Sequence, residues 1–320
     1  MTLSLPARTA PGERRRMDLA ARRTRHGIAL GLHRQRSTEV VDLTTCLVLH
    51  PTLVALLPPL RDLLARCQGL RREASVIANL LDSGPDVLLR TDAALQLADR
   101  LRLTEFARTH ALPRIAWALG DDEPEPIAVL HPATTSLAGV PVAPPPGAFL
   151  QASASGEAAI VESVCNALPA KGPVAELFAG CGTITFALAQ RTRVSAWEGD
   201  TASAAALRSA ANHARLAGRV EVIQRDLVRQ PLQAKELARF SAVVLDPPFA
   251  GAAAQMAQIA AAKTPVVIYV NCNPATLSRD ARLLRQAGYR LHSATPIDQF
   301  LWSARLESVA VFATLPVTTR

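Results

Sequence analysis

Five cysteines occur in the 320-residue chain, and one of them stands where it could act as a nucleophile. Cys272 lies between Asn271 and Asn273, after the apolar run 266–270 and just before a predicted helix over 275–286. A thiol near the start of a helix lies close to the positive end of the helix dipole, which favours the reactive thiolate. The sequence therefore predicts Cys272 as a candidate nucleophile.

The other four cysteines have simpler interpretations. They are scattered and show no Cys-x-x-Cys spacing, which argues against a zinc site or a disulfide framework. Cys165 falls on the apolar side of a predicted helix, and Cys181 lies inside a turn where its small size is sufficient reason for it. A free cysteine is most often a small buried apolar side chain, and this is also the starting interpretation for Cys46 and Cys67.

The segment Val174–Thr183 is typical of a nucleotide-binding turn. An apolar strand runs into Gly180 and Gly182 and then into a predicted helix. Glycines there let the backbone bend tightly and approach a ligand closely. The next predicted strand ends at Glu198, and a carboxylate at that point can bind the two ribose hydroxyls of an adenosine.

Acids also end the two strands that come next. Asp226 follows a predicted strand over 220–224 and could reach an adenine ring, and Asp246 follows a strand over 242–245. One acid at such a position is often only a helix cap. Acids after three successive strands favour a cofactor site instead.

A nicotinamide-dependent enzyme is one alternative that this pattern leaves open. Two details argue against it. The turn lacks the third glycine of the dinucleotide fingerprint. The sequence Asp246-Pro-Pro-Phe249 also has no usual place in a dehydrogenase.

Strands alternate with helices from residue 146 to the end of the chain, which predicts an α/β fold with a doubly wound, mostly parallel sheet. Two closing strands, near 289–295 and 306–313, are close enough to form an antiparallel hairpin. The carboxyl ends of parallel strands line the ligand crevice in this fold, so Cys272 is expected beside the cofactor. The other expected elements are strands 174–178, 194–198 and 266–270 and helices 155–168, 201–216 and 251–262.

The sequence pattern of residues 1–145 predicts a smaller α+β domain. The expected elements are β-structure over 14–48, a helix over 51–66, a hairpin over 75–91, a helix over 92–110 and short strands over 115–119 and 127–130. The proline-rich stretch Pro141–Gly147 is typical of a linker. The catalytic domain is therefore expected to span 146–320.

Composition bears on the class of partner. The net charge is +8, and nine arginines but only two acids stand in the first 36 residues. Guanidinium groups suit phosphate oxygens, although an Arg-biased composition would give the same excess. No apolar run reaches the roughly 20 residues of a membrane helix, and no secretory signal begins the chain. We expect a cytoplasmic monomer without a membrane anchor.

These segments together resemble the class I RNA 5-methyluridine methyltransferases, which modify uracil at carbon 5 in tRNA and 23S rRNA. The order and approximate spacing of the motifs agree over residues 147–313. The shared motifs are Phe149-Leu-Gln151, Leu-Phe-x-Gly-x-Gly from Leu177, Asp246-Pro-Pro, Cys-Asn-Pro-Ala-Thr-Leu-x-Arg-Asp from Cys272, and Glu307-Ser-Val309.

The resemblance implies a Rossmann-like domain that uses S-adenosylmethionine (SAM) and acts on RNA, with 23S rRNA favoured over tRNA. It implies Cys272 as the nucleophile that adds to uracil carbon 6 and Glu307 as the base that removes the proton from carbon 5. The positions that it implies for the SAM pocket are Gln151, Phe178, Gly180, Gly182, Thr183, Glu198, Asp226 and Asp246.

The chain departs from the family pattern at several positions. The residue after Asp-Pro-Pro is often Arg in the family but is Phe249 here, and a His commonly stands where this chain has Arg305. Thr183 and Ser153 replace asparagines. None of these changes removes a catalytic atom, so the effect expected from them is on how the substrate is positioned.

The front of the chain also departs from the family. Many members begin with a small RNA-binding β-barrel and a cysteine-rich stretch that holds a 4Fe–4S cluster. Three of those ligands lie ahead of the first residue of this chain, and Cys46 resembles the fourth. One ligand cannot hold a cluster, so neither an iron–sulfur cluster nor another metal site is expected. Truncation and loss of the module in this lineage are both open.

Two further functions remain as alternatives. Asp246-Pro-Pro-Phe249 resembles the motif of enzymes that methylate exocyclic amino groups, which need no cysteine nucleophile. The chain could also be an inactive RNA-binding protein. The presence of both Cys272 and Glu307 argues against the second alternative.

Overall fold

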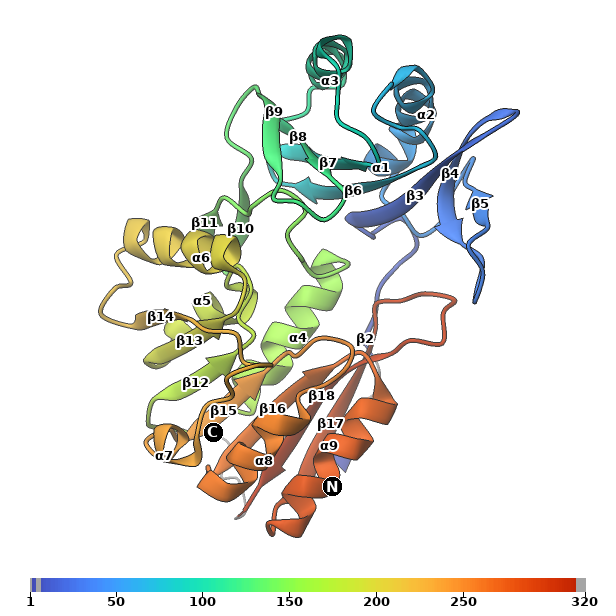
Figure 1. The fold of residues 1–320 in the computed structure, drawn as a ribbon. Coiled ribbons are helices and arrows are strands. Elements are labelled where there is room, and N and C mark those ends of the chain that lie inside the picture. Colours follow the sequence, from blue (N-terminus) through green and yellow to red (C-terminus); the bar gives the residue numbers. More distant parts are fainter. Residues whose placement is uncertain (1, 4–6, 315–320) are drawn as a thin grey trace. The chain divides into compact units, whose positions relative to one another are not determined.

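Two units make up the fold in the computed structural model, which describes residues 2–3 and 7–314 (Figure 1). Unit 1 holds the described residues up to Thr9, the segment Ser136–Val142 and the described residues from Ala154 onward. Unit 2 holds Ala10–Thr135 and Ala143–Ser153. The sequence suggested one division after residue 145, whereas the chain enters unit 1 three times. One reason is that the first two strands pair with a strand near the end of the chain.

Unit 1 is built around a nine-stranded sheet with the order β1-β17-β18-β16-β15-β12-β13-β14, and β2 also pairs with β17. Strands β12 to β16 are parallel, and β12 lies between β13 and β15. The strand order therefore reverses beside β12, where α/β sheets bind their ligands. The strands are β1 (Thr2–Leu3), β2 (Ala7–Arg8), β12 (Val174–Leu177), β13 (Val194–Glu198), β14 (Val220–Gln224), β15 (Ala242–Leu245), β16 (Val266–Asn271), β17 (Arg290–Asp298) and β18 (Glu307–Ala313).

Helices cover both faces of this sheet. The connections from β12 to β13 and from β15 to β16 run in opposite directions along it, so right-handed crossovers put their helices on opposite faces. Met256, Ile259 and Leu284, from two of these helices, are fully buried in a core that includes Leu245 and Tyr269 of the sheet. The helices are α4 (Ala154–Asn166), α5 (Thr183–Ala189), α6 (Thr201–His213), α7 (Ala234–Leu237), α8 (Ala253–Ala262) and α9 (Pro274–Gln286).

The last two strands form the antiparallel hairpin that the sequence predicted. β18 pairs with β17 on one side and with β16 on the other, and both pairings are antiparallel. Asn271 at the end of β16 lies opposite Ser308 at the start of β18. The carboxyl end of β16 and the amino end of β18 therefore lie at the same edge of the sheet. The doubly wound, Rossmann-like α/β prediction is confirmed.

Unit 2 contains a seven-stranded sheet with the order β5-β4-β3-β6-β7-β8-β9. Leucines of its helices, among them Leu57 and Leu64, pack with Leu19, Leu30 and Val76 of the sheet in a separate apolar core. The elements are β3 (Arg16–Thr24), β4 (Gly27–His33), β5 (Val40–Asp42), α1 (Pro51–Ala55), α2 (Leu57–Arg66), β6 (Glu73–Leu81), β7 (Gly84–Thr91), α3 (Leu97–Thr109), β8 (Arg114–Leu119) and β9 (Glu125–Val129).

Helix α3 begins five residues later than the predicted start at 92. The side chain of Asp92 accepts hydrogen bonds from the main-chain N–H groups of Arg71, Arg72 and Glu73, which keeps this residue in a loop. A capping box between Gln96 and Asp99 then starts the helix.

The prediction of a linker over 141–147 is wrong, because the segment is held by strand pairing and by hydrogen bonds from other parts of the chain. Val140–Val142 forms strand β11, which pairs with β10 (Thr135–Leu137). The following prolines lie in unit 2, where Arg114 Nη2 donates to Pro144 O at 2.8 Å and Asn79 Nδ2 donates to Ala148 O at 2.9 Å. Side chains thus take up carbonyl groups of a proline-rich segment that has few N–H groups of its own.

No helix in the described part of the chain is long and apolar enough to cross a membrane.

Candidate functional site

The turn after β12 has the backbone geometry of a ligand-binding loop. Phe178, Gly180 and Gly182 all have positive φ values, of 63°, 56° and 104°. A Cβ on Gly182 would lie 2.5 Å from Leu207 Cδ1, whereas a Cβ on Gly180 would meet no heavy atom within 4 Å. Gly182 is therefore required for packing, and Gly180 leaves open space at the turn. The left-handed backbone at Phe178 is a strained conformation of the kind found at binding sites.

Glu198 holds this turn in place. Its Oε2 accepts a hydrogen bond from the N–H of Gly180 at 2.7 Å, and its Oε1 accepts one from the N–H of Asp200 at 2.7 Å. Each carboxylate oxygen has a second lone pair. The carboxylate can therefore accept ribose hydroxyls while it fixes the glycine turn. Thr183 begins α5 directly after the turn.

Asp226 and Asp246 follow β14 and β15. Asp226 Oδ1 accepts hydrogen bonds from the N–H groups of Val228 and Arg229, at 3.0 and 3.1 Å, so this acid also caps a local turn. The main-chain N–H of Asp246 lies 3.4 Å from Leu177 O at the end of β12. Both acids belong to the carboxyl edge of the sheet.

Glu176 in the middle of β12 is a functional candidate that the sequence reasoning missed. It is 2% exposed, and its Oε2 has no hydrogen-bond partner among the described residues. Burial raises the pKa of Glu176 to about 8, and the charges of Asp246 and Glu198 act in the same direction, against hydrogen bonding from Thr185. The signal was visible in the sequence, because Glu is out of place inside an apolar strand.

Cys272 and Glu307 lie together at the edge where β16 ends and β18 begins. Glu307 is 5% exposed. Its Oε2 accepts a hydrogen bond from Gln299 Nε2 at 2.9 Å, and its Oε1 has no partner among the described residues. Burial raises the pKa of Glu307 to about 7, a value suited to a group that takes up and releases protons near neutral pH.

The surroundings of Cys272 also affect the pKa of its thiol. Burial raises the pKa of the Cys272 thiol, and the carboxylates of Glu307 and Asp246 raise it further, while Arg305 lowers it. These groups therefore act against the thiolate that a position near the helix start would favour. Buried Cys181, by contrast, has its pKa raised to about 11, chiefly by burial, and fits the structural role expected for it.

Helix α9 anchors the loop that follows Asp246. Asn273, the N-cap of α9, donates from Nδ2 to Phe249 O at 3.2 Å, and its Oδ1 accepts from Ala275 N. Asp280 is fully buried, and its Oδ2 accepts from Ala252 N and from the Tyr269 hydroxyl, at 2.9 and 2.8 Å. One helix therefore fixes both Cys272 and the loop 246–252.

Gln151 is the predicted ligand that does not belong to unit 1. It lies in unit 2, where its main-chain oxygen accepts a hydrogen bond from Arg15 Nε at 3.1 Å. Its role toward SAM stays a prediction from the resemblance.

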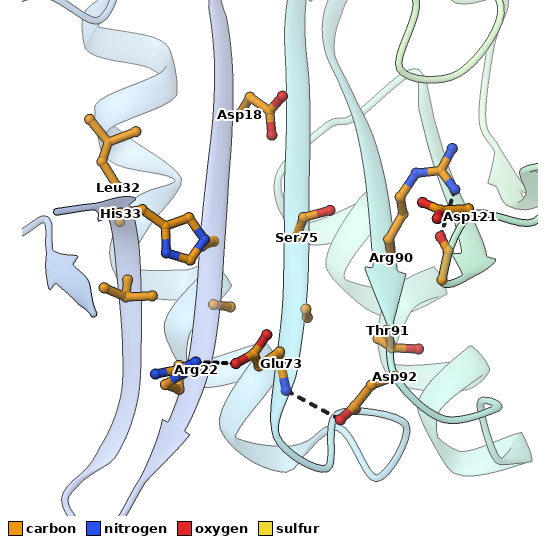
Figure 2. Close-up of a pocket in the computed structure, with 16 residues that line it drawn as sticks. Asp18, Arg22, Leu32, His33, Glu73, Ser75, Arg90, Thr91, Asp92 and Asp121 are labelled. Carbon is orange, nitrogen blue, oxygen red and sulfur yellow. Dashed lines mark hydrogen bonds and ion pairs between the residues drawn. The ribbon is translucent and has the colours of Figure 1, made fainter. Parts of the chain in front are cut away.

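A separate pocket of about 420 Å³ lies on the sheet of unit 2, over strands β3 to β7 (Figure 2). Ala20, Gly31 and Ser75 are among its smaller lining residues. Two of its charged lining residues, Arg22 and Glu73, form an ion pair with each other. None of the predicted catalytic residues lines this pocket.

In the described part of the chain, no group of three or more His, Cys, Asp or Glu side chains could hold a metal ion. Cys46 is a half-buried free cysteine. The absence of an iron–sulfur cluster remains a prediction.

Comparison with known proteins points to one family. Residues 144–314 match a family described as tRNA (uracil-5-)-methyltransferase. An uncharacterized RNA methyltransferase of Mesorhizobium japonicum is 40% identical over 304 residues, covering 94% of this chain and 72% of the relative. The 23S rRNA (uracil(1939)-C(5))-methyltransferase RlmD of Pectobacterium atrosepticum is 33% identical over 322 residues, covering 97% of this chain and 69% of the relative.

A similar fold occurs in a solved structure. The tRNA (uracil-54, C5)-methyltransferase of Pyrococcus abyssi, in complex with S-adenosyl-L-homocysteine, superposes with a TM-score of 0.72 at 19% identity. The match covers 96% of this chain and 78% of that one. At this identity the likeness concerns the fold.

Proposed function

This chain belongs to the tRNA (uracil-5-)-methyltransferase family, and we propose that it forms 5-methyluridine in RNA through a covalent Cys272 intermediate. One observation carries the proposal. A thiol and a buried carboxyl group with raised pKa, Cys272 and Glu307, stand at the same strand edge as the glycine turn and its acids.

The residues around the glycine turn fit SAM. SAM carries a positive sulfonium, an ammonium group and an adenosine with two ribose hydroxyls. Gly180 leaves open space at the turn, and Glu198 retains acceptor capacity beside it. Glu176, with its unpartnered buried oxygen, adds polar capacity under the same edge. We assign the pocket to Phe178, Gly180, Gly182, Thr183, Glu198, Asp226 and Asp246, and on the family resemblance also to Gln151.

The proposed reaction uses Cys272 and Glu307 in succession. The Cys272 thiolate adds to carbon 6 of uracil, and the electron pair of the C5–C6 double bond moves toward the carbonyl oxygen at carbon 4. SAM, when bound, supplies an electrophilic methyl group to carbon 5. Glu307 then takes the hydrogen at carbon 5 as a proton. The electrons of that C–H bond restore the C5–C6 double bond and expel the Cys272 thiolate.

We propose 23S rRNA as the substrate. The relative RlmD, which is named for a uracil of 23S rRNA, aligns with 97% of this chain. The net charge of +8 supports a polyanionic partner. Methylation of an RNA substrate does not require a membrane. We propose that the protein acts as a cytoplasmic monomer without an iron–sulfur cluster.

The decisive experiment combines product analysis with trapping. We expect 5-methyluridine by nucleoside mass spectrometry after 23S rRNA fragments and tRNA are incubated separately with labelled SAM, with label chiefly in the rRNA. RNA containing 5-fluorouridine should form a covalent adduct with the intact enzyme and none with Cys272→Ala. Activity that survives in Cys272→Ala would instead support methylation of an exocyclic amine by the Asp246-Pro-Pro-Phe249 loop.

A further inference from the structure

Phe249 presents a large apolar ring to solvent at the carboxyl edge of the sheet. Its exposed fraction is 55%. The loop that carries it is fixed, because Phe249 O accepts from Asn273 Nδ2, Ala250 O accepts from Arg279 Nη2 at 2.9 Å, and the N–H of Ala252 donates to Asp280. An exposed ring on an anchored loop is held ready for a contact outside the chain's own core.

Arg305 is the side chain that covers this ring. Its guanidinium carbon lies 5.2 Å from the centroid of Phe249, a cation–π distance. Arg305 stands two residues before Glu307, and it is close enough to Cys272 for its charge to lower the pKa of the thiol. The pair therefore joins the loop after β15 to the segment before β18, next to both proposed catalytic residues.

We propose that Phe249 and Arg305 act as one unit that positions the target uracil over Cys272. Phe249 offers a ring on which the base stacks. Arg305, held by that ring, donates a hydrogen bond to the base carbonyl oxygen that gains negative charge when the thiolate adds. Phe249 is thus a positioning residue, and Arg305 contacts the reacting base. This assignment rests on the proposed methylation of uracil carbon 5.

The first test needs no RNA, because it follows alkylation of Cys272 against pH in the free protein by peptide mass spectrometry. The charged groups that face the thiol are Glu307 at the start of β18, Asp246 after β15 and Arg305 in the approach to β18. Arg305→Gln should raise the midpoint of alkylation by about one pH unit, and Arg305→Lys should restore most of it. Phe249→Ala should raise it too, but should add nothing to Arg305→Gln.

The matched control is Arg285→Gln, an exposed arginine in the last turn of α9, at the far end of that helix from Cys272. It should leave the alkylation midpoint unchanged. An unchanged midpoint in Arg305→Gln, or a Phe249→Ala effect that adds fully to it, would overturn the pair as a unit.

The second test exchanges the ring and the cation between positions 249 and 305, which are in contact. Phe249→Arg alone places two cations together, and Arg305→His alone removes the strong donor, so each should lower kcat/KM for RNA methylation about tenfold or more. The double variant Phe249→Arg/Arg305→His should recover to within about threefold of the wild type. Losses that simply multiply in the double variant would contradict the proposal.

The two tests separate this inference from the proposed function. A wild-type protein that makes no 5-methyluridine would refute the proposed function and, with it, the contact to uracil. The alkylation profiles would still decide whether Arg305, held by Phe249, acts on Cys272. A wild type that makes 5-methyluridine while the exchange variants behave additively would refute the pair alone.

Discussion

Glu307, the proposed base, is buried and accepts a hydrogen bond from Gln299, so we expect its protonation state to control turnover. A base must be ionised to remove the proton from carbon 5. Because the pKa of Glu307 is raised to about 7, single-turnover proton removal should increase as the pH rises through about 7. Rapid-quench measurements of 5-methyluridine release between pH 5.5 and 8.5 test this, and a flat profile would contradict it.

Replacement of the base should separate the two halves of the reaction. Glu307→Gln keeps the hydrogen bond partner of Gln299 but cannot accept the proton, so a methylated RNA should stay attached to Cys272. A denaturation-resistant RNA–protein band that contains labelled methyl is expected. The double variant Cys272→Ala/Glu307→Gln is the control and should give no band. Rapid release of product by Glu307→Gln would exclude Glu307 as the base.

Glu176 should make the protein less stable as the pH rises. Its folded pKa, about 8, lies above the ordinary value of 4.5, so between these values the folded state binds more protons than the unfolded state. The neutral carboxyl contributes its full share to the free energy of unfolding below pH 4.5. As the pH rises from 4.5 to about 8, this share is lost at about 1.4 kcal/mol for each pH unit. Denaturant melts at pH 5 and pH 8 should show a clearly smaller pH dependence for Glu176→Gln than for the wild type.

The sequence predicts which residues lie at the candidate site better than it predicts the pKa values of their side chains. Cys272 and the acids at strand ends follow from strand and helix periodicity, which places them at one edge. The raised pKa of Cys272 does not follow, because it depends on burial and on Glu307 and Asp246, which reach the thiol from other strands. Three-dimensional packing decides the balance between these charges and the helix dipole.

At the scale of elements, Asp280 connects α9, β16 and the loop after β15. It is fully buried and accepts hydrogen bonds from Tyr269, Ala252 and Arg279. Asp280→Ala should lower the free energy of unfolding by about 3 kcal/mol and should reduce methylation, because the Phe249 loop loses its anchor. Denaturant unfolding and kcat/KM measure the two effects.

Asp280→Asn is the matched variant for this prediction. Asn can still accept from Ala252 and Tyr269, and it loses mainly the charge interaction with Arg279, whose side chain is half exposed. We expect a loss of about 1 kcal/mol and largely retained activity. Equal losses in Asn and Ala variants would show that the charge, and not the hydrogen bonds to the loop, matters.

Segment 143–153 shows why some elements escaped prediction. The local composition of Pro141–Gly147 predicted a linker. Carbonyl groups of this segment and of the residue after it, however, accept hydrogen bonds from Arg114 and Asn79, which are distant in sequence. The strand pairs of β1 and β2 with β17 are equally non-local. Sequence periodicity predicts helices and strands whose pattern is local. It does not predict segments whose structure depends on hydrogen bonds from residues far away in the sequence.

At the scale of the whole molecule, the chain carries a net charge of +8. At one end of unit 2, Arg25, Arg66 and Arg71 are exposed where β3 turns, α2 ends and β6 begins. Arg23 joins these elements by donating to Leu70 O, Leu64 O and Cys67 O. Exposed guanidinium groups suit RNA phosphates.

Substitution of Arg25 and Arg71 by Gln should therefore weaken RNA binding without altering the chemistry. Each RNA phosphate that is no longer neutralised should reduce the slope of log affinity against log salt by about 0.7 to 0.9, while kcat at saturating RNA stays unchanged. Lys235→Gln is the control, because α7 precedes β15 and so lies toward the amino edge of the sheet, away from the proposed site. Filter binding at several salt concentrations measures the slope. If two cations are removed from a surface that binds phosphates, RNA binding must release fewer counterions. An unchanged slope in the double variant would therefore place the RNA-binding surface elsewhere on the protein.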